Sequence, residues 1–167
     1  AKKVEDNGMP ALAHLTCVKA DEAKLAEVLG QLQGFGVKNI LALRGDIPAD
    51  MQGEEIGSFA HASELMRFVK QQGDFCVGGA AYPEGHPESG SLEKDIENTK
   101  YKVDAGVDFL VTQMFFDNTI LYNYMFRLLR AGINVPVVPG IMPVTSVKQI
   151  IRICQLSGTK LPPQFRA

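Results

Sequence analysis

The sequence lacks the features that mark membrane proteins and nucleic-acid binders. No apolar stretch in its 167 residues approaches the ~18 residues that a membrane-spanning helix needs. No charged-then-apolar leader opens the chain. The net charge is -2, and its 22% charged residues are spread along the chain rather than gathered in a basic stripe. We therefore expect a globular protein with no nucleic-acid partner and no membrane partner.

Cysteine is scarce. The chain has three, Cys17, Cys76 and Cys154, which cannot all pair. Each lies in an apolar segment, and no Cys-x-x-Cys spacing occurs. These features predict buried, reduced thiols, no bound metal, and a cytoplasmic location.

Two common active-site signatures are also missing. No Gly-x-Gly-x-x-Gly follows a predicted strand, because Gly34-Phe35-Gly36 precedes one. This excludes a Rossmann dinucleotide-binding turn. No Ser, Cys or Thr stands in a recognisable nucleophile elbow.

What the sequence does contain is an alternation of apolar strands and amphipathic helices. Helical periods lie between the strands, with Asp21, Asp117 and either Thr145 or Ser146 as predicted N-caps and Gly34 ending the first helix. The strands are nearly continuous apolar runs, as expected for a parallel sheet covered on both faces. They are predicted at Leu12–Val18, Ile40–Leu43, Phe75–Ala81, Phe109–Phe115 and Pro136–Pro139.

Five βα units fit two α/β architectures. One is a complete doubly wound sheet, and the other is an incomplete (β/α)8 TIM barrel, which in full needs roughly 250 residues. The chain opens with Ala1-Lys2-Lys3 rather than Met and ends near Pro162-Pro163. Both features favour part of a barrel, with residues 1–167 belonging to one domain.

Every predicted strand ends in a cluster of polar or turn-forming residues. Parallel strands present their carboxyl ends on one face, so these tips should build a single site. The long polar loop from Ile47 to Ser58 could cover that site as a lid. The tips are His14–Cys17, Arg44-Gly45-Asp46, Tyr82–His86, Thr112-Gln113 with Asp117, and Pro139–Pro143.

Each candidate also has a structural interpretation. Arg44 and Asp46 could form a surface ion pair, His14 could be a core residue, and Tyr82–His86 could be an exposed proline-rich turn. Gln113 either binds a flat heterocycle with an amide edge or bonds to the backbone.

The helical candidates have structural interpretations too. Asp95, Asn98 and Lys102 recur on one helical face, which could be solvated. Gln149 stands three residues after Ser146, as in a capping box.

Taken together, six motifs resemble the methylenetetrahydrofolate reductase family, in order and with matching spacing over essentially the whole chain. They are Ala13-His14-Leu15-Thr16-Cys17, Ala42-Leu43-Arg44-Gly45-Asp46, Ala81-Tyr82-Pro83-Glu84-Gly85-His86-Pro87-Glu88, Lys102-Val103-Asp104-Ala105-Gly106, Thr112-Gln113-Met114-Phe115-Phe116-Asp117 and Pro139-Gly140-Ile141-Met142-Pro143.

The resemblance implies a (β/α)8 barrel of which this chain covers roughly the third to seventh strands. It implies noncovalent FAD and the reduction of 5,10-methylenetetrahydrofolate to 5-methyltetrahydrofolate by NADH or NADPH, in one-carbon metabolism and methionine synthesis. The reaction would proceed by two successive hydride transfers, with ping-pong kinetics. A homo-oligomer is implied for the full-length protein. The family's proton-donating glutamate lies on the first strand, so we expect the isolated chain to be inactive.

Site residues follow from the same resemblance. Asp46 and Gln113 would be catalytic, Asp46 by favouring positive charge on the folate and Gln113 by bonding to the pterin. Gln113, Gln149 and Ile153 would contact folate or nicotinamide. FAD would be bound by His14, Arg44, Gly45, Asp46, His61, Ala62, Ala80, Tyr82, His86, Asp95, Asn98, Tyr101, Lys102 and Val111.

Two positions depart from the family pattern. Tyr101 stands where some members have an arginine, and Ile153 where some have an aromatic residue. Two other hypotheses remain at this point. One is a five-stranded doubly wound module that binds a flavin or nucleotide without catalysis, and the other is a divergent barrel enzyme with a different one-carbon substrate.

Overall fold

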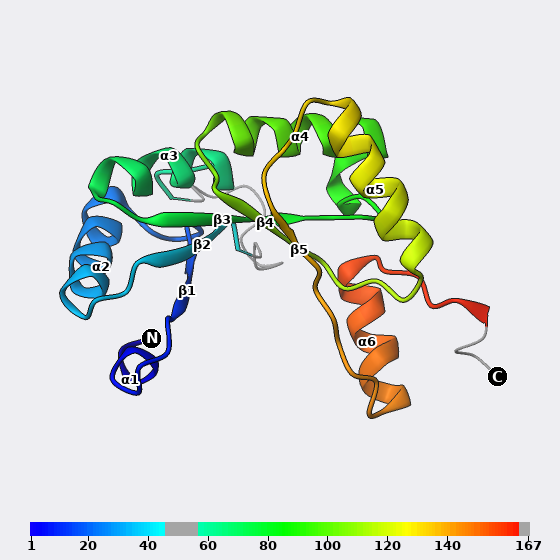
Figure 1. The fold of residues 1–167 in the computed structure, drawn as a ribbon, viewed down its shortest axis with the longest axis horizontal. Coiled ribbons are helices and arrows are strands. Elements are labelled where there is room, and N and C mark those ends of the chain that lie inside the picture. The colour runs from blue at the N-terminus through cyan, green and yellow to red at the C-terminus, as the bar shows by residue number, and fades with distance from the viewer. Residues whose placement is uncertain (46–56, 164–167) are drawn as a thin grey trace. The chain divides into compact units, whose positions relative to one another are not determined.

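The computed structural model describes residues 1–45 and 57–163. Asp46 and most of the predicted lid loop lie outside these ranges. Within the described residues helices and strands alternate, and the short 3-10 helix η2 precedes α4 (Figure 1). Their bounds are α1 (Lys2–Glu5), β1 (Leu12–Thr16), α2 (Glu22–Gly34), β2 (Asn39–Leu43), α3 (Ala62–Gln72), β3 (Cys76–Ala81), η2 (Pro87–Ser89), α4 (Leu92–Asp104), β4 (Phe109–Thr112), α5 (Asn118–Arg130), β5 (Val137–Val138) and α6 (Val147–Ser157).

All five strands predicted from the sequence are present, and several are shorter than expected. The chain divides into two compact units, which are described separately. Unit 1 comprises Ala1–Gly79 and Lys102–Phe109, and unit 2 comprises Ala80–Tyr101 and Leu110–Ala167. Strand β3 and helix α4 each contribute residues to both units.

The strands pair in the order in which they occur in the sequence, β1-β2-β3-β4-β5. In unit 1, the parallel pairing sets Leu12 opposite Asn39 and Asn39 opposite Cys76. In unit 2, Leu110 lies opposite Val137. In a doubly wound sheet the spatial order of the parallel strands differs from their order in the sequence, with a reversal at the switch point. In a barrel, strands that are consecutive in the sequence lie side by side. The order therefore favours the barrel over the doubly wound alternative.

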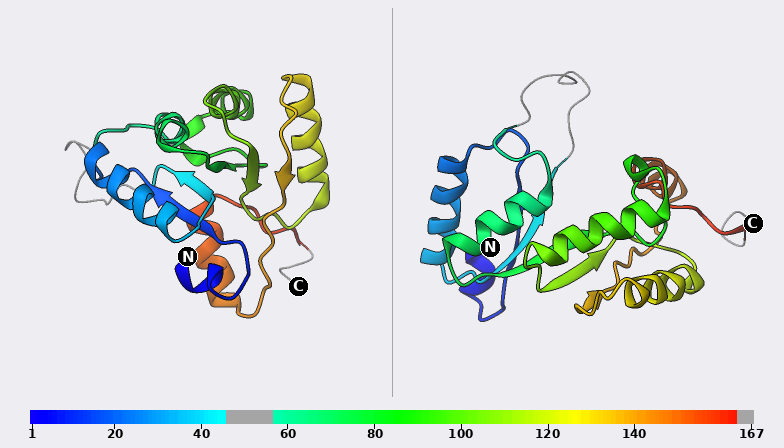
Figure 2. Two further views of the ribbon diagram at one scale, coloured as in Figure 1. Left: turned by 60° about the vertical axis from the view of Figure 1, so that its left-hand side comes forward. Right: turned by 90° about the horizontal axis from the view of Figure 1, so that it is seen from above.

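In unit 1, one face of the strands is covered by helices. Helix α3 contacts β2 and also contacts α2 (Figure 2). Asp21 caps α2 as predicted, because its Oδ1 accepts a hydrogen bond from the Lys24 amide at 2.6 Å. The core between these elements is aliphatic, and its fully buried members include Leu25, Leu29, Ile40, Ala42, Leu65, Met66, Val69 and Val77.

Strand β1 is not covered on both faces as the sequence predicted. Leu15 is buried, but Leu12, His14 and Thr16 are exposed. These three residues alternate with the buried one and share the other face of the strand, which no described residue covers. The interpretation of His14 as a core residue is therefore wrong.

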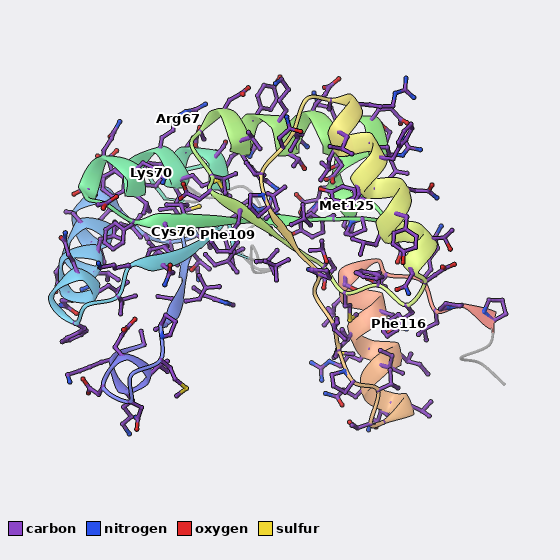
Figure 3. All side chains as sticks on the ribbon, in the orientation of Figure 1. Arg67, Lys70, Cys76, Phe109, Phe116 and Met125 are labelled. Carbon is purple, nitrogen blue, oxygen red and sulfur yellow. The ribbon has the colours of Figure 1, made fainter. Side chains whose placement is uncertain are left out.

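The amino ends of β3 and β4 are held together by charged side chains. Lys70 Nζ donates to Asp108 Oδ2 at 2.6 Å and to the Phe75 carbonyl at 3.0 Å. The same Asp108 oxygen accepts from the Val77 amide at 2.6 Å. Figure 3 labels Lys70 on α3 and Phe109 at the start of β4. Polar bonds at these strand ends stabilise the fold and leave the opposite, carboxyl ends for a site.

Gly78 is required by the packing of Phe109 in unit 1. A side-chain carbon added at Gly78 would lie only 2.5 Å from Phe109 Cζ and 3.1 Å from Leu41 Cδ1. The aromatic ring therefore occupies the space that glycine leaves open on β3.

Unit 2 is built around α5, whose Tyr124 and Leu128 are almost wholly buried together with Leu110 of β4. Asp117 caps α5 as predicted, since its Oδ1 accepts from the Thr119 amide at 2.8 Å. Ser146 is the N-cap of α6 but makes no side-chain capping bond, so the capping box predicted with Gln149 does not form.

The cysteines match the prediction in part. All three thiols are free, but only Cys17 is buried, while Cys76 and Cys154 are half-buried. Burial raises the pKa of the Cys17 thiol, and its Sγ donates to the Arg44 carbonyl at 3.5 Å. No described helix is both long enough and apolar enough to cross a membrane.

Candidate functional site

The loop after β3 carries the densest cluster of predicted site residues, and all of it lies in unit 2. Gly85 has φ +87°, and its amide donates to the Tyr82 carbonyl at 2.9 Å. This tight turn brings Tyr82 and His86 together, with ring centroids 4.6 Å apart in an edge-to-face arrangement. Both rings are half-buried. The interpretation of this segment as an exposed turn is therefore wrong.

Asp95 fixes the loop to the first turn of α4. Its side chain is only 3% exposed, and its Oδ1 accepts from the His86 amide at 3.2 Å and from Ser89 Oγ at 2.9 Å. Its Oδ2 is buried and has no hydrogen-bond partner among the described residues. A carboxylate in this position also interacts favourably with the helix dipole. The solvated-face interpretation of Asp95 is wrong.

A hydrogen bond to the His86 ring determines which of its two nitrogens can act as a donor. Its Nδ1 accepts a hydrogen bond from the Glu88 amide at 3.1 Å. In the neutral ring the proton is therefore assigned to Nε2, which can donate to a ligand. Asn98, half-buried on α4, donates from Nδ2 to Ser89 Oγ at 3.4 Å. Asp95, Ser89 and Asn98 thus form one hydrogen-bonded group that supports the loop.

Gln113 stands at the carboxyl end of β4, also in unit 2. Its backbone amide donates to the Ala81 carbonyl at 2.7 Å, which places it beside the end of β3. Its side-chain Oε1 accepts from the Met114 amide at 2.9 Å. The backbone-bonded interpretation therefore holds for the carbonyl half of the amide. Its Nε2 makes no hydrogen bond with the described residues and can donate to a ligand.

The tip after β5 is held tightly against the tip of β4. The Gly140 amide donates to Thr112 Oγ1 at 2.8 Å, and Thr112 is 5% exposed. A side-chain carbon at Gly140 would overlap the Thr112 carbonyl oxygen. Only glycine allows this close approach, which fixes the backbone immediately before Gln113.

In unit 1, polar residues gather at the carboxyl ends of β1 and β2. The Val18 amide donates to the Arg44 carbonyl at 3.0 Å, continuing the pairing beyond Thr16 and Leu43. Gly45 has φ +87°, and a side-chain carbon there would lie 3.2 Å from Thr16 Cβ. Arg44 is half-buried and His14 is exposed on the uncovered face of β1.

The remaining predicted site residues differ in exposure. His61 is exposed, precedes α3, and its amide donates to Glu64 Oε2 at 3.1 Å. Tyr101 is 54% exposed. Gln149 is exposed on α6, and its Oε1 accepts from Thr145 Oγ1 at 3.4 Å. Half-buried positions are occupied by Ala62, Ala80, Lys102, Val111 and Ile153.

Several residues that shape the unit 2 cluster were not singled out as site residues from the sequence. Ser89 looks like an ordinary turn residue, Thr112 stands in a predicted strand tip without a role of its own, and Tyr124 has the spacing of an apolar helix face. Tyr124 lies close enough to Asp95 for that carboxylate to raise the pKa of its hydroxyl, after burial as the larger cause. Ser89, which follows a polar strand tip, and Thr112, which stands within one, carried a sequence signal that could have identified them.

The sequential parallel βα units, with polar residues at their carboxyl ends, define an α/β protein of the TIM-barrel class. Solved structures support the same fold at low sequence identity. An uncharacterized protein from Clostridium thermocellum, described as binding two copies of 5-methyl-5,6,7,8-tetrahydrofolic acid, superposes with a TM-score of 0.64 at 16% identity, over 98% of this chain and 54% of its own. A dihydrodipicolinate synthase superposes with a TM-score of 0.56 at 17% identity, over 93% of this chain and 57% of its own.

The sequence comparisons name the family. The methylenetetrahydrofolate reductase family model matches residues 1–167, and the chain belongs to that family. It is 37% identical over 162 residues to the 5,10-methylenetetrahydrofolate reductase of Escherichia coli, covering 96% of this chain and 53% of that protein. It is 39% identical over 155 residues to methylenetetrahydrofolate reductase 1 of Schizosaccharomyces pombe, covering 91% of this chain and 26% of that protein. The chain thus spans about half the length of the bacterial relative.

Proposed function

We propose that the full-length protein containing this chain reduces 5,10-methylenetetrahydrofolate to 5-methyltetrahydrofolate, with FAD as cofactor and NADH or NADPH as electron donor. The observation that carries the proposal is the family match over residues 1–167. The sequential strand order supports it, because the catalytic residues of TIM barrels come from the carboxyl ends of successive strands.

The residues of unit 2 fit a flavin chemically. A flavin ring offers carbonyl and ring-nitrogen acceptors on one edge and two flat faces. His86 Nε2 is a donor left over after the internal hydrogen bond of this side chain. Tyr82 supplies an aromatic ring at the same loop. By resemblance to the family, the proposed FAD contacts are His14, Arg44, Gly45, Asp46, His61, Ala62, Ala80, Tyr82, His86, Asp95, Asn98, Tyr101, Lys102 and Val111.

Bound FAD would store the hydride between its transfer from NAD(P)H and its transfer to the folate. Gln113 would orient the pterin by donating from Nε2, since its Oε1 is already bonded to Met114. Asp46 would favour the positive charge that develops on the folate. Gln149 and Ile153, both on α6, would contact folate or nicotinamide.

The proposal also covers the domain organisation, location and oligomeric state of the full-length protein. Residues 1–167 would belong to one catalytic barrel domain, and the full-length protein would be a cytoplasmic homo-oligomer. The isolated chain would lack turnover, because it spans about half of the bacterial relatives.

The test uses the purified full-length protein. We expect a flavin absorbance band, NAD(P)H oxidation that depends on 5,10-methylenetetrahydrofolate, and formation of 5-methyltetrahydrofolate. Gln113→Ala should reduce the folate-dependent rate by about 10-fold to 100-fold, which corresponds to the loss of a hydrogen bond of about 1.5–3 kcal/mol. It should leave NAD(P)H oxidation by an artificial quinone acceptor nearly unchanged.

Gln155→Ala on the exposed surface of α6 is the matched control and should behave as the wild type. Protein that purifies folded but never binds a flavin, or that oxidises NAD(P)H without forming 5-methyltetrahydrofolate, would refute the proposal.

A further inference from the structure

The segment that follows α6 lies across the loop after β3, within unit 2. Both carboxylate oxygens of Glu84 accept from the Lys160 amide, each at 3.2 Å. A side-chain carbon added at Gly158 would lie 3.1 Å from Pro87 Cγ, so the two backbones are close there as well. Two separate points of the loop therefore contact residues 158–160, although Glu84 and Lys160 are 76 residues apart in the sequence.

A third contact fixes the same segment to the end of β4. Thr159 is 6% exposed, and its Oγ1 donates to the Met114 carbonyl at 3.2 Å. The Thr159 amide also donates to Ser157 Oγ at 3.3 Å, which stiffens the turn at the end of α6. The end of α6 is thus held by the loop after β3 on one side and by the residue after Gln113 on the other.

Glu84 lies between two groups of proposed ligand contacts, one on the loop after β3 and one on α6. Tyr82 and His86 stand two residues before and after it on the loop. Cys154 on α6 lies close enough for the Glu84 charge to raise its pKa, with burial as the larger cause. Burial raises the pKa of the Glu84 carboxyl itself, and the Lys160 amide opposes this effect. Lys160 is therefore the partner that compensates the half-buried carboxylate.

From this geometry we propose that Glu84 is a positioning residue, which ties the Tyr82–His86 loop to α6 and so couples the proposed flavin contacts to Gln149 and Ile153. The inference rests on the proposed function for the identity of the two ligands. The hydrogen bonds between Glu84 and Lys160 are a property of the chain and do not depend on either ligand. Loss of the acceptor should loosen both segments together, because the Glu84–Lys160 hydrogen bonds link them directly.

The experiment compares Glu84→Ala with Glu84→Gln in the full-length protein. Glutamine keeps an oxygen that can accept from Lys160, and alanine does not. Glu84→Ala should increase amide hydrogen exchange in residues 82–86 and 157–160 together. It should also weaken FAD binding and raise the KM for the folate, each about fivefold, with a smaller change in kcat. Glu84→Gln should restore all of these values to within about twofold of the wild type.

Glu97→Ala on the exposed face of α4 is the control, because it removes a carboxylate whose partner is the surface residue Lys94. If Glu84→Ala does not fold, Thr159→Val tests the same segment and should increase exchange in residues 157–160 and 82–86. Unchanged exchange in a folded Glu84→Ala protein, or equal damage from Glu84→Gln, would overturn the inference. If Glu84→Ala increases amide hydrogen exchange but the wild-type protein binds no FAD, the positioning role of Glu84 would be supported and the proposed function refuted.

Discussion

Tyr124 gives a quantitative prediction about alkaline stability. Its side chain is 1% exposed in the core of unit 2. Burial, with a contribution from the Asp95 carboxylate, raises the pKa of the hydroxyl from 10.0 to about 12. Above pH 10 the unfolded chain ionises this tyrosine while the folded protein keeps it protonated. The folded protein therefore binds more protons, and its stability falls as the pH rises through this range.

The magnitude follows from the two pKa values. A shift of two units corresponds to about 2.7 kcal/mol once the pH has passed both of them. At about pH 11 the unfolded state has gained about 1.4 kcal/mol relative to the folded state. Below about pH 9 this contribution is constant, so the loss is confined to alkaline solution.

The assay is urea unfolding of the wild type and of Tyr124→Phe, each at about pH 8 and about pH 11. Other tyrosines and the lysines titrate equally in both proteins, so the difference between the two pH-dependent losses isolates Tyr124. We expect the wild type to lose about 1.4 kcal/mol more than the variant. Equal losses would show that the Tyr124 hydroxyl ionises as it does in the unfolded chain.

Three further predictions concern stability near neutral pH, each measured by urea unfolding. Gly140→Ala should cost about 1–3 kcal/mol because the new methyl group overlaps the Thr112 carbonyl, whereas Gly30→Ala, with open space around it in α2, should be neutral or stabilising. Asp21→Ala should cost about 1 kcal/mol through loss of the α2 cap. Leu65→Ala should cost about 2–5 kcal/mol, since the Leu65 side chain is fully buried. A loss below about 0.5 kcal/mol in Gly140→Ala or Leu65→Ala would contradict the packing described.

The sequence predicted the elements well because their signals are local. Apolar runs and helical periods depend on neighbours a few residues away, and the predicted caps Asp21 and Asp117 bond within their own helix turns. The family followed from six ordered motifs and is confirmed by the match over the whole chain.

The sequence was less informative about which polar side chains are buried and which are exposed. His14 has the sequence context of a core residue, yet it is exposed, because exposure depends on which elements cover a strand face. Asp95 has the spacing of a solvated helix residue, yet it is buried, because the loop after β3 folds onto α4 and bonds to its carboxylate. Neither outcome can be read from helical or strand periodicity.

The amino-acid sequence alone thus determined the order of strands and helices, the polar strand tips and the family. Only the tertiary structure decided the sequential strand pairing, the burial of Asp95 and the bond between Glu84 and Lys160. The physical reason is distance along the chain. Local patterns arise from torsional preferences and periodic burial, whereas a contact between residues 76 positions apart depends on the path of every element between them.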